Sequence, residues 1–137
     1  MLGREVADAA YSWYVLRAWL SQREGPMVTL ITRGRFTQSY VKGMVDAPED
    51  REPAVRKLIE ATGGKLISLY FTTGESDFMV IAEGDDPESI IAGLMGAAAS
   101  GAVTDLITIR AWTGAQFQAI AAKASKAATV YRAPGKR

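Results

Sequence analysis

The 137-residue chain contains no cysteine and no histidine. These two absences exclude thiol nucleophiles, catalytic arrangements built on Ser-His-Asp or Cys-His, and zinc sites with Cys or His ligands. A disulfide-linked secreted scaffold is excluded as well, and a reducing cytoplasm is the location that we expect. Any catalytic group in this chain has to be a carboxylate, a lysine, a tyrosine or a backbone dipole. We expect neither a metal site nor a bound cofactor.

The chain also has little net charge. Its 16 basic and 15 acidic residues leave a formal net charge of +1, and such a balance creates no field that attracts a polyanion. We expect no nucleic acid and no membrane among its partners. With 48% hydrophobic and 23% charged residues, the composition is that of a soluble globular protein, and the length favours one domain.

Residues 1–26 differ in composition from the rest of the chain. They hold Trp13 and Trp19, and their apolar residues recur at helical spacing, so we expect an N-terminal extension with a short amphipathic helix. The apolar run is too short to span a bilayer, and it lacks the basic start and cleavage site of a signal peptide. An alternative hypothesis is that Met27 is the natural start and that residues 1–26 are a translated leader. An intact amino terminus at Met1, measured by mass spectrometry, would exclude it.

From Met27 onward, the spacing of apolar residues changes repeatedly between that of strands and that of helices. This alternation predicts a single folded domain over residues 27–131, followed by a flexible basic tail over 132–137. The expected elements are a strand at 27–36, a helix from about 50 to 62, strands at 65–72 and 77–83, a helix from about 87 to 100, a strand at 103–112 and a helix from 114 to about 131.

Short polar motifs indicate where several of these elements begin. Asp86 followed by Pro87 is typical of a helix start, because Asp caps free N–H groups and proline fits the first helical position. Thr113 and Gln116 have the spacing of a capping box. Gly74 lies in the connection between the second and third strands, where it permits a positive φ that a residue with a Cβ resists.

The order of elements predicts a ferredoxin-like βαββαβ fold of the α+β class, extended by a C-terminal helix. Such a domain has a four-stranded antiparallel sheet with two helices on one face, and we expect the spatial strand order four, one, three, two. In the third strand, Phe78, Val80 and Ala82 alternate with Met79 and Ile81, so both faces of this strand are apolar.

The second strand has the same character. Alternation places Ile67, Leu69 and Phe71 on one face, and Leu66 and Tyr70 on the other. A sheet face without helices would then expose several large side chains, each worth about 1.5–3 kcal/mol when buried. A second copy of the chain, as in a dimeric α/β barrel, is the expected cover. The terminal helix and the N-terminal extension are the alternatives.

The stretch GGKLISLYFTTGESDFMVIAEGDD, with VRKLIEATGG before it and ITIRAWT after it, resembles the GYD-domain family. The family signature places a Gly, a Tyr and an Asp in the hairpin before the third strand. Gly74 and Asp77 match two of these positions, and Ser76 occupies the tyrosine position. The resemblance extends from about Met27 to Ala124. The resemblance implies a dimeric α/β barrel. It implies no particular biochemical activity, because the family has none that is settled.

The same hairpin is similar to that of the effector-binding domain of leucine-responsive regulators. In those proteins a Gly-x-x-Asp turn lies near an intersubunit ligand site, which implies a ligand role for Gly74 and Asp77. No DNA-binding helix-turn-helix is visible in the first 26 residues. The favoured structural alternative is that Gly74 permits the turn and that Asp77 binds nearby backbone amides.

Three arginines and two tyrosines complete the set of candidate ligand-binding residues. Arg33, Arg35 and Arg110 lie on strands expected to be neighbours, where arginine can clamp a carboxylate, although ion pairs with nearby acidic residues are the favoured alternative. Tyr40 and Tyr70, together with Trp112, can line a pocket between sheet and helices or simply belong to the core.

These observations predict a cytoplasmic, homo-oligomeric barrel protein that binds a small molecule in or beside the barrel. Two alternatives remain open. One is a cofactor-independent enzyme for a small aromatic or acidic substrate, in which Asp77 or Tyr70 transfers a proton. The other is a protein-interaction module that docks a partner through its open sheet face or through the helix expected in residues 1–26.

Overall fold

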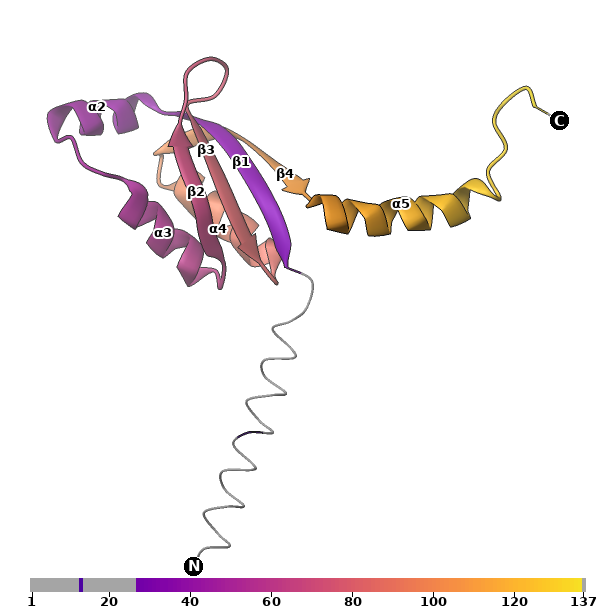
Figure 1. The fold of residues 1–137 in the computed structure, drawn as a ribbon. Coiled ribbons are helices and arrows are strands. Elements are labelled where there is room, and N and C mark those ends of the chain that lie inside the picture. Colours follow the sequence, from indigo (N-terminus) through magenta and orange to yellow (C-terminus); the bar gives the residue numbers. More distant parts are fainter. Residues whose placement is uncertain (1–12, 14–26, 137) are drawn as a thin grey trace, which may run out of the picture.

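The structure is a computed structural model that describes residue 13 and residues 27–136. The helix expected in residues 1–26 lies outside the described residues, residue 13 excepted, and the hypothesis that Met27 is the natural start stays untested. The elements, in chain order, are β1 (Val28–Phe36), α2 (Gln38–Asp46), α3 (Glu52–Ala61), β2 (Lys65–Phe71), β3 (Phe78–Gly84), α4 (Pro87–Ala99), β4 (Val103–Ala111) and α5 (Gly114–Ala128) (Figure 1).

The four strands form one antiparallel sheet in the order β2-β3-β1-β4. This order confirms the predicted ferredoxin-like α+β fold. Helix α3 packs against β2, and α4 packs against β3 and β4, so both helices lie on the same side of the sheet. Among the residues that the structure describes, no helix has both the length and the apolar character needed to cross a membrane.

The hydrophobic core lies between this side of the sheet and the two helices. Ile59 of α3 and Ile90 of α4 are its most completely buried large side chains. They pack with buried residues of three strands, and Leu94 completes the cluster from α4. The strand members of the core are Val28, Leu30, Leu66, Phe78, Val80 and Ala82.

The predicted helix starts at Asp86 and Thr113 are both present. The Asp86 carboxylate accepts hydrogen bonds from the hydroxyl and the backbone N–H of Ser89, and these bonds hold the pKa of Asp86 below its ordinary value. Thr113 and Gln116 form the complete capping box. Gly74 adopts a φ of +93°, as expected for the hairpin between β2 and β3.

Helix α2 was not predicted, because we expected residues 37–50 to be an irregular connection. The Thr37 hydroxyl accepts a hydrogen bond from the Tyr40 N–H and donates one to the Gly101 carbonyl, which fixes the start of the helix to the end of α4. No residue of α2 is buried. Tyr40, Val41, Met44 and Val45 recur at helical spacing along it, so the sequence carried a signal for this helix that the prediction missed.

A second correction concerns the faces of β2. The pairing with β3 shifts register between Leu66 and Ser68, so a bulge interrupts the strict alternation that we expected. Leu66 pairs with Ala82 and Leu69 pairs with Val80. Both leucines therefore lie on the side of the helices, because directly opposite residues share a face.

The other side of the sheet, which we call the open face, carries no helix of the described chain (Figure 1). Tyr70, Ile107 and Ile109 on this face are 61%, 54% and 49% exposed. The register assigns to it Lys65, Ser68 and Tyr70 of β2, Met79, Ile81 and Glu83 of β3, Thr29, Ile31 and Arg33 of β1, and Ile107, Ile109 and Ala111 of β4. Met79 and Ile81 lie on one face of β3, and Phe78 and Val80 lie on its other face, which confirms the prediction.

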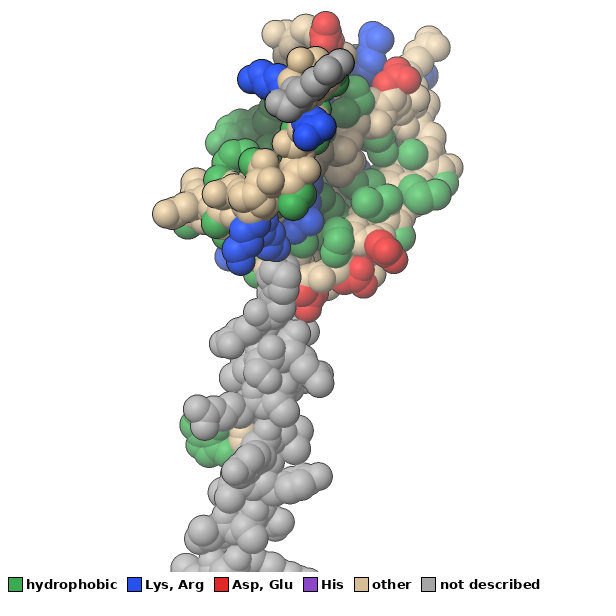
Figure 2. All heavy atoms as spheres, turned by 90° about the vertical axis from the view of Figure 1, so that its right-hand side faces the viewer, with side chains coloured by type: hydrophobic (Ala, Val, Ile, Leu, Met, Phe, Trp, Pro, Cys, Tyr) green, Lys and Arg blue, Asp and Glu red, His purple; other side chains and the backbone are tan. Residues whose placement is uncertain are grey.

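Helix α5 projects away from the sheet and buries no residue. The terminal helix therefore does not provide the cover that we considered for the open face. Figure 2 shows hydrophobic side chains exposed on the side of the molecule from which α5 projects. Phe117, near the start of α5, is itself exposed.

Candidate functional site

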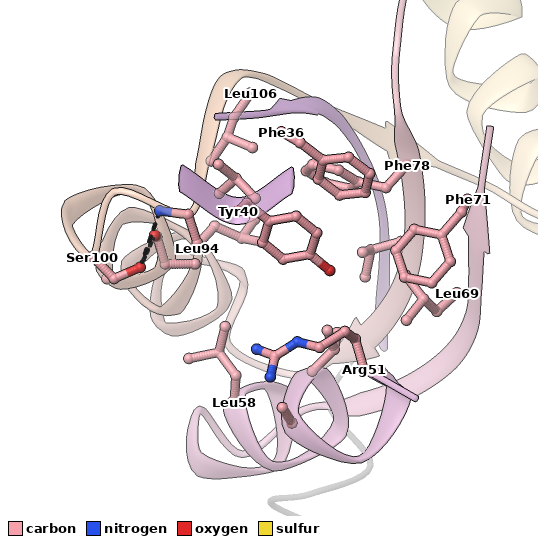
Figure 3. A pocket seen from close by; sticks show the side chains of 17 residues that line it. Phe36, Tyr40, Arg51, Leu58, Leu69, Phe71, Phe78, Leu94, Ser100 and Leu106 are labelled. Atoms are coloured by element: carbon pink, nitrogen blue, oxygen red, sulfur yellow. Dashed lines mark hydrogen bonds between the residues drawn. The ribbon is translucent and has the colours of Figure 1, made fainter. Parts of the chain in front are cut away.

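A cavity of about 350 Å³ lies between the helix side of the sheet and helices α3 and α4, next to the start of α2 (Figure 3). Its volume falls at the lower end of the range of about 300–1,000 Å³ that is typical of small-molecule sites. The lining residues are Phe36, Tyr40, Arg51, Ala54, Val55, Leu58, Leu69, Phe71, Phe78, Val80, Leu94, Gly96, Ala97, Ser100, Ala102, Val103 and Leu106.

One wall of the cavity is aromatic. The rings of Phe36 and Tyr40 stack with centroids 4.3 Å apart and planes inclined by 11°. Phe78 and Phe71 lie 5.7 Å and 5.8 Å from the Phe36 ring, within the range in which aromatic pairs attract each other beyond simple burial. Phe36 ends β1 and Tyr40 occupies the first turn of α2, so the Thr37 cap between them sets this geometry.

Arg51 and Tyr40 supply polar groups to an otherwise largely apolar lining. Figure 3 shows the Arg51 guanidinium and the Tyr40 hydroxyl both directed into the same part of the hollow. The guanidinium Nη1 donates a hydrogen bond of 2.6 Å to Oε1 of Glu49. This bond, the Glu49 charge and the nearby Tyr40 phenol raise the pKa of Arg51, whereas partial burial acts in the opposite direction. The arginine therefore presents a permanent positive charge to the cavity.

A smaller hollow of about 270 Å³ lies beside the cavity, under α2. Phe36, Tyr40 and Phe71 border both spaces. Val41, Met44 and Val45 of α2 form the rest of its lining. Helix α2 therefore forms an apolar margin at the aromatic end of the cavity.

Arg51 was not among the residues that the sequence pointed to. It stands in the charged run DAPEDREP, which has the composition of a solvated connection. Only the packing of α3 against the sheet brings this side chain to the cavity. The sole local signal is its place two residues before Pro53, at the start of the predicted helix, because that position fixes it at one end of α3.

The family model of the GYD domain matches residues 30–121, about two thirds of the chain. The chain belongs to the GYD domain family. Comparison with curated proteins gave no match. Among solved structures, the chain is similar to the crystal structure of MtbAldR, with 15% sequence identity and a TM-score of 0.41 over 63% of this chain. The aligned region spans about half, 52%, of that protein.

In this GYD protein, the signature residues Gly74 and Asp77 lie at the β2–β3 hairpin and not in the cavity lining. The Asp77 carboxylate accepts a hydrogen bond of 2.9 Å from the Phe36 N–H, and the Asp77 N–H donates to the Gly34 carbonyl at 2.8 Å. These bonds agree with the structural alternative for Asp77. A ligand role for either residue stays a prediction.

The three candidate arginines of the GYD protein do not converge on one point. Arg33 lies on the open face opposite Met79 and Ile107, and strand alternation places Arg35 on the same face. Arg110 pairs with Leu30 on the other side of the sheet. The ion pairs found within the described part of the chain involve none of these three arginines.

The candidate aromatic residues are also separated. Tyr40 lines the cavity, whereas Tyr70 is exposed on the open face. Trp112 follows β4, and the Arg110 guanidinium lies over its ring at 5.2 Å. Both candidate catalytic residues, Asp77 and Tyr70, thus lie outside the cavity lining, and the cavity gives no support to the enzyme alternative.

Proposed function

We propose that this GYD protein is a homo-oligomer that binds a small, largely apolar molecule in the cavity between its sheet and its helices. The observation that carries the proposal is the cavity itself: about 350 Å³ in volume, lined mainly by apolar side chains, with Arg51 and Tyr40 at one end. A concave apolar site with a few convergent polar groups is the usual form of a ligand site.

The energetics of packing support the same proposal. Apolar surface that is removed from water contributes about 25 cal/mol per Å² to binding. The cavity leaves part of the apolar surface of residues such as Phe78, Val80 and Leu94 without a packing partner in this chain. A bound apolar molecule would make these contacts.

The open face supports the oligomeric part of the proposal. Tyr70 on one edge strand and Ile107 and Ile109 on the other are exposed, on a side of the sheet that no helix of the described residues covers. Ile31, Met79 and Ile81 lie between them on the two central strands. The same face carries Arg33 near one end of β1 and Glu83 near the opposite end of β3. A twofold axis through the middle of the face brings such opposite charges together, which is the self-complementarity that a symmetric dimer requires.

Binding can be tested with Nile red, a neutral dye whose emission rises in apolar surroundings. We expect saturable binding to the wild-type protein and loss of most of the signal in Ala97→Leu, because Ala97 lines the cavity. The control is Ala92→Leu, on the same helix but exposed and outside the lining, which should bind like the wild type. Equal binding by both variants would place the dye elsewhere and contradict the proposal.

A further inference from the structure

We infer that the ligand of this cavity is a compact monocarboxylic acid with an apolar body, whose carboxylate is held by the Arg51 guanidinium beside the Tyr40 hydroxyl. This inference rests on the proposed function, and it adds the chemical class of the ligand.

The charge of the lining selects an anion. Of the 17 residues that line the cavity, Arg51 is the only one with a charged side chain. Glu49, its hydrogen-bonding partner, is not part of the lining. A positive charge that borders an apolar space attracts a ligand of opposite charge, because a charge-assisted hydrogen bond is stronger where water is partly excluded.

The geometry of the guanidinium favours a carboxylate. Arginine presents five N–H donors in a planar fork that matches two carboxylate oxygens. Only the Nη1 group is engaged by Glu49, so Nη2 and Nε have donors left for a ligand. The Tyr40 hydroxyl points into the same end of the hollow and can donate to the second oxygen (Figure 3).

A single guanidinium also limits the charge of the ligand. One arginine neutralises one carboxylate, whereas the lining provides no second cation for a dianion. Glu49 competes for Arg51, but its side chain is 58% exposed and that of Arg51 is 34% exposed. Ion pairs with this exposure contribute little, so a carboxylate bound in the cavity can share or replace Glu49.

The shape of the cavity limits the apolar body. Its volume of about 350 Å³ admits a compact molecule. The aromatic wall of Phe36, Phe71 and Phe78 suits a flat ring, and the opposite wall of Leu58, Leu94 and Val55 is aliphatic. We therefore expect an aromatic acid to bind more tightly than a linear aliphatic acid of similar size.

The test measures displacement of Nile red by two matched pairs, cinnamic acid with cinnamyl alcohol and octanoic acid with octanol. In the wild type, we expect each acid to bind about tenfold more tightly than its alcohol, as charge-assisted hydrogen bonds do relative to neutral ones. In Arg51→Gln this preference should disappear while the dye still binds. Lys57→Gln removes one charge from the exposed face of α3, outside the lining, and should leave the preference unchanged.

Glu49→Gln should change the affinity for the acids in the opposite direction from Arg51→Gln. It removes the competing carboxylate and leaves the guanidinium in place, so the affinity for the acids should rise several-fold without a change for the alcohols. This variant keeps the inference testable if Arg51→Gln is poorly folded, which far-ultraviolet circular dichroism detects.

The possible outcomes separate the inference from the proposed function. If Nile red binds in the cavity but acids and alcohols compete equally, the inference is wrong and the proposed function stands. An acid preference that persists in Arg51→Gln, or that falls in Glu49→Gln, also overturns the inference. If folded wild-type protein does not bind the dye and none of the four compounds raises its melting temperature, the proposed function fails and the inference fails with it.

Discussion

The carboxylate of Asp77 accepts a hydrogen bond from the backbone N–H of Phe36 at 2.9 Å. This contact joins the β2–β3 hairpin to the last residue of β1, the same residue whose ring stacks on Tyr40 in the cavity wall. A signature position of the GYD family therefore supports the candidate site from outside, through the backbone. Asp77 positions the aromatic wall and does not itself line the cavity.

Replacement of Asp77 should lower stability. In Asp77→Ala, the half-buried Phe36 N–H loses its acceptor, and the free energy of unfolding should fall by about 1–2 kcal/mol. Asp77→Asn retains a side-chain carbonyl acceptor and should lose less. Urea denaturation measures both values. The account is contradicted if Asp77→Ala is as stable as the wild type, because the bond would then contribute nothing to the fold.

Two glycines of α4 should respond in opposite directions to alanine. A Cβ on Gly93 would lie 2.6 Å from Cγ2 of Thr62 at the end of α3, so Gly93→Ala should destabilise the protein by about 1–3 kcal/mol through overpacking. A Cβ on Gly96 meets nothing within 4 Å, so Gly96→Ala should stabilise the helix by up to about 1 kcal/mol.

Thermal denaturation of the two variants, made in parallel, provides the comparison. The close approach of α3 and α4 predicts a lower melting temperature for Gly93→Ala and an equal or higher one for Gly96→Ala. Equal shifts in the same direction would mean that the two helices do not pack as closely as the Thr62 contact indicates.

Much of the fold follows from local features of the sequence. The caps at Asp86 and Thr113 and the glycine at position 74 are short-range signals, and the structure reproduces each of them. The strand order follows from the order of elements, because few sheet topologies accommodate βαββαβ. Local chemistry and topology therefore suffice for the sheet and its two packed helices.

The features that were missed depend on tertiary context. The bulge between Leu66 and Ser68 changes which face of the sheet the residues of β2 point to. A second shift of register, in the pairing of β4 with β1, lies near Asp105, which adopts a φ of +52°. Neither bulge interrupts the apolar pattern enough to be read from the sequence. Arg51 reaches the cavity only through the packing of α3. Of the predicted ligand residues, Tyr40 alone lines the cavity, and for Tyr40 the sequence supplied only its aromatic character.

The structure also separates two substitutions that the sequence could not tell apart. Leu69 lies on the helix side, where it packs against the core and lines the cavity, so Leu69→Lys places a charge in an apolar space and should unfold or strongly destabilise the chain. Met79 lies on the open face, so Met79→Lys should leave the monomer folded. Circular dichroism with urea denaturation distinguishes the two outcomes.

The central claim is that the open face binds a second copy while the helix side holds the cavity. Sedimentation equilibrium of the wild type and of Met79→Lys tests this claim most directly. The account predicts at least twice the chain mass of 14.7 kDa for the wild type. It predicts the single-chain mass for a folded Met79→Lys that still binds Nile red. A wild-type protein that sediments as a monomer at micromolar concentration would contradict the claim.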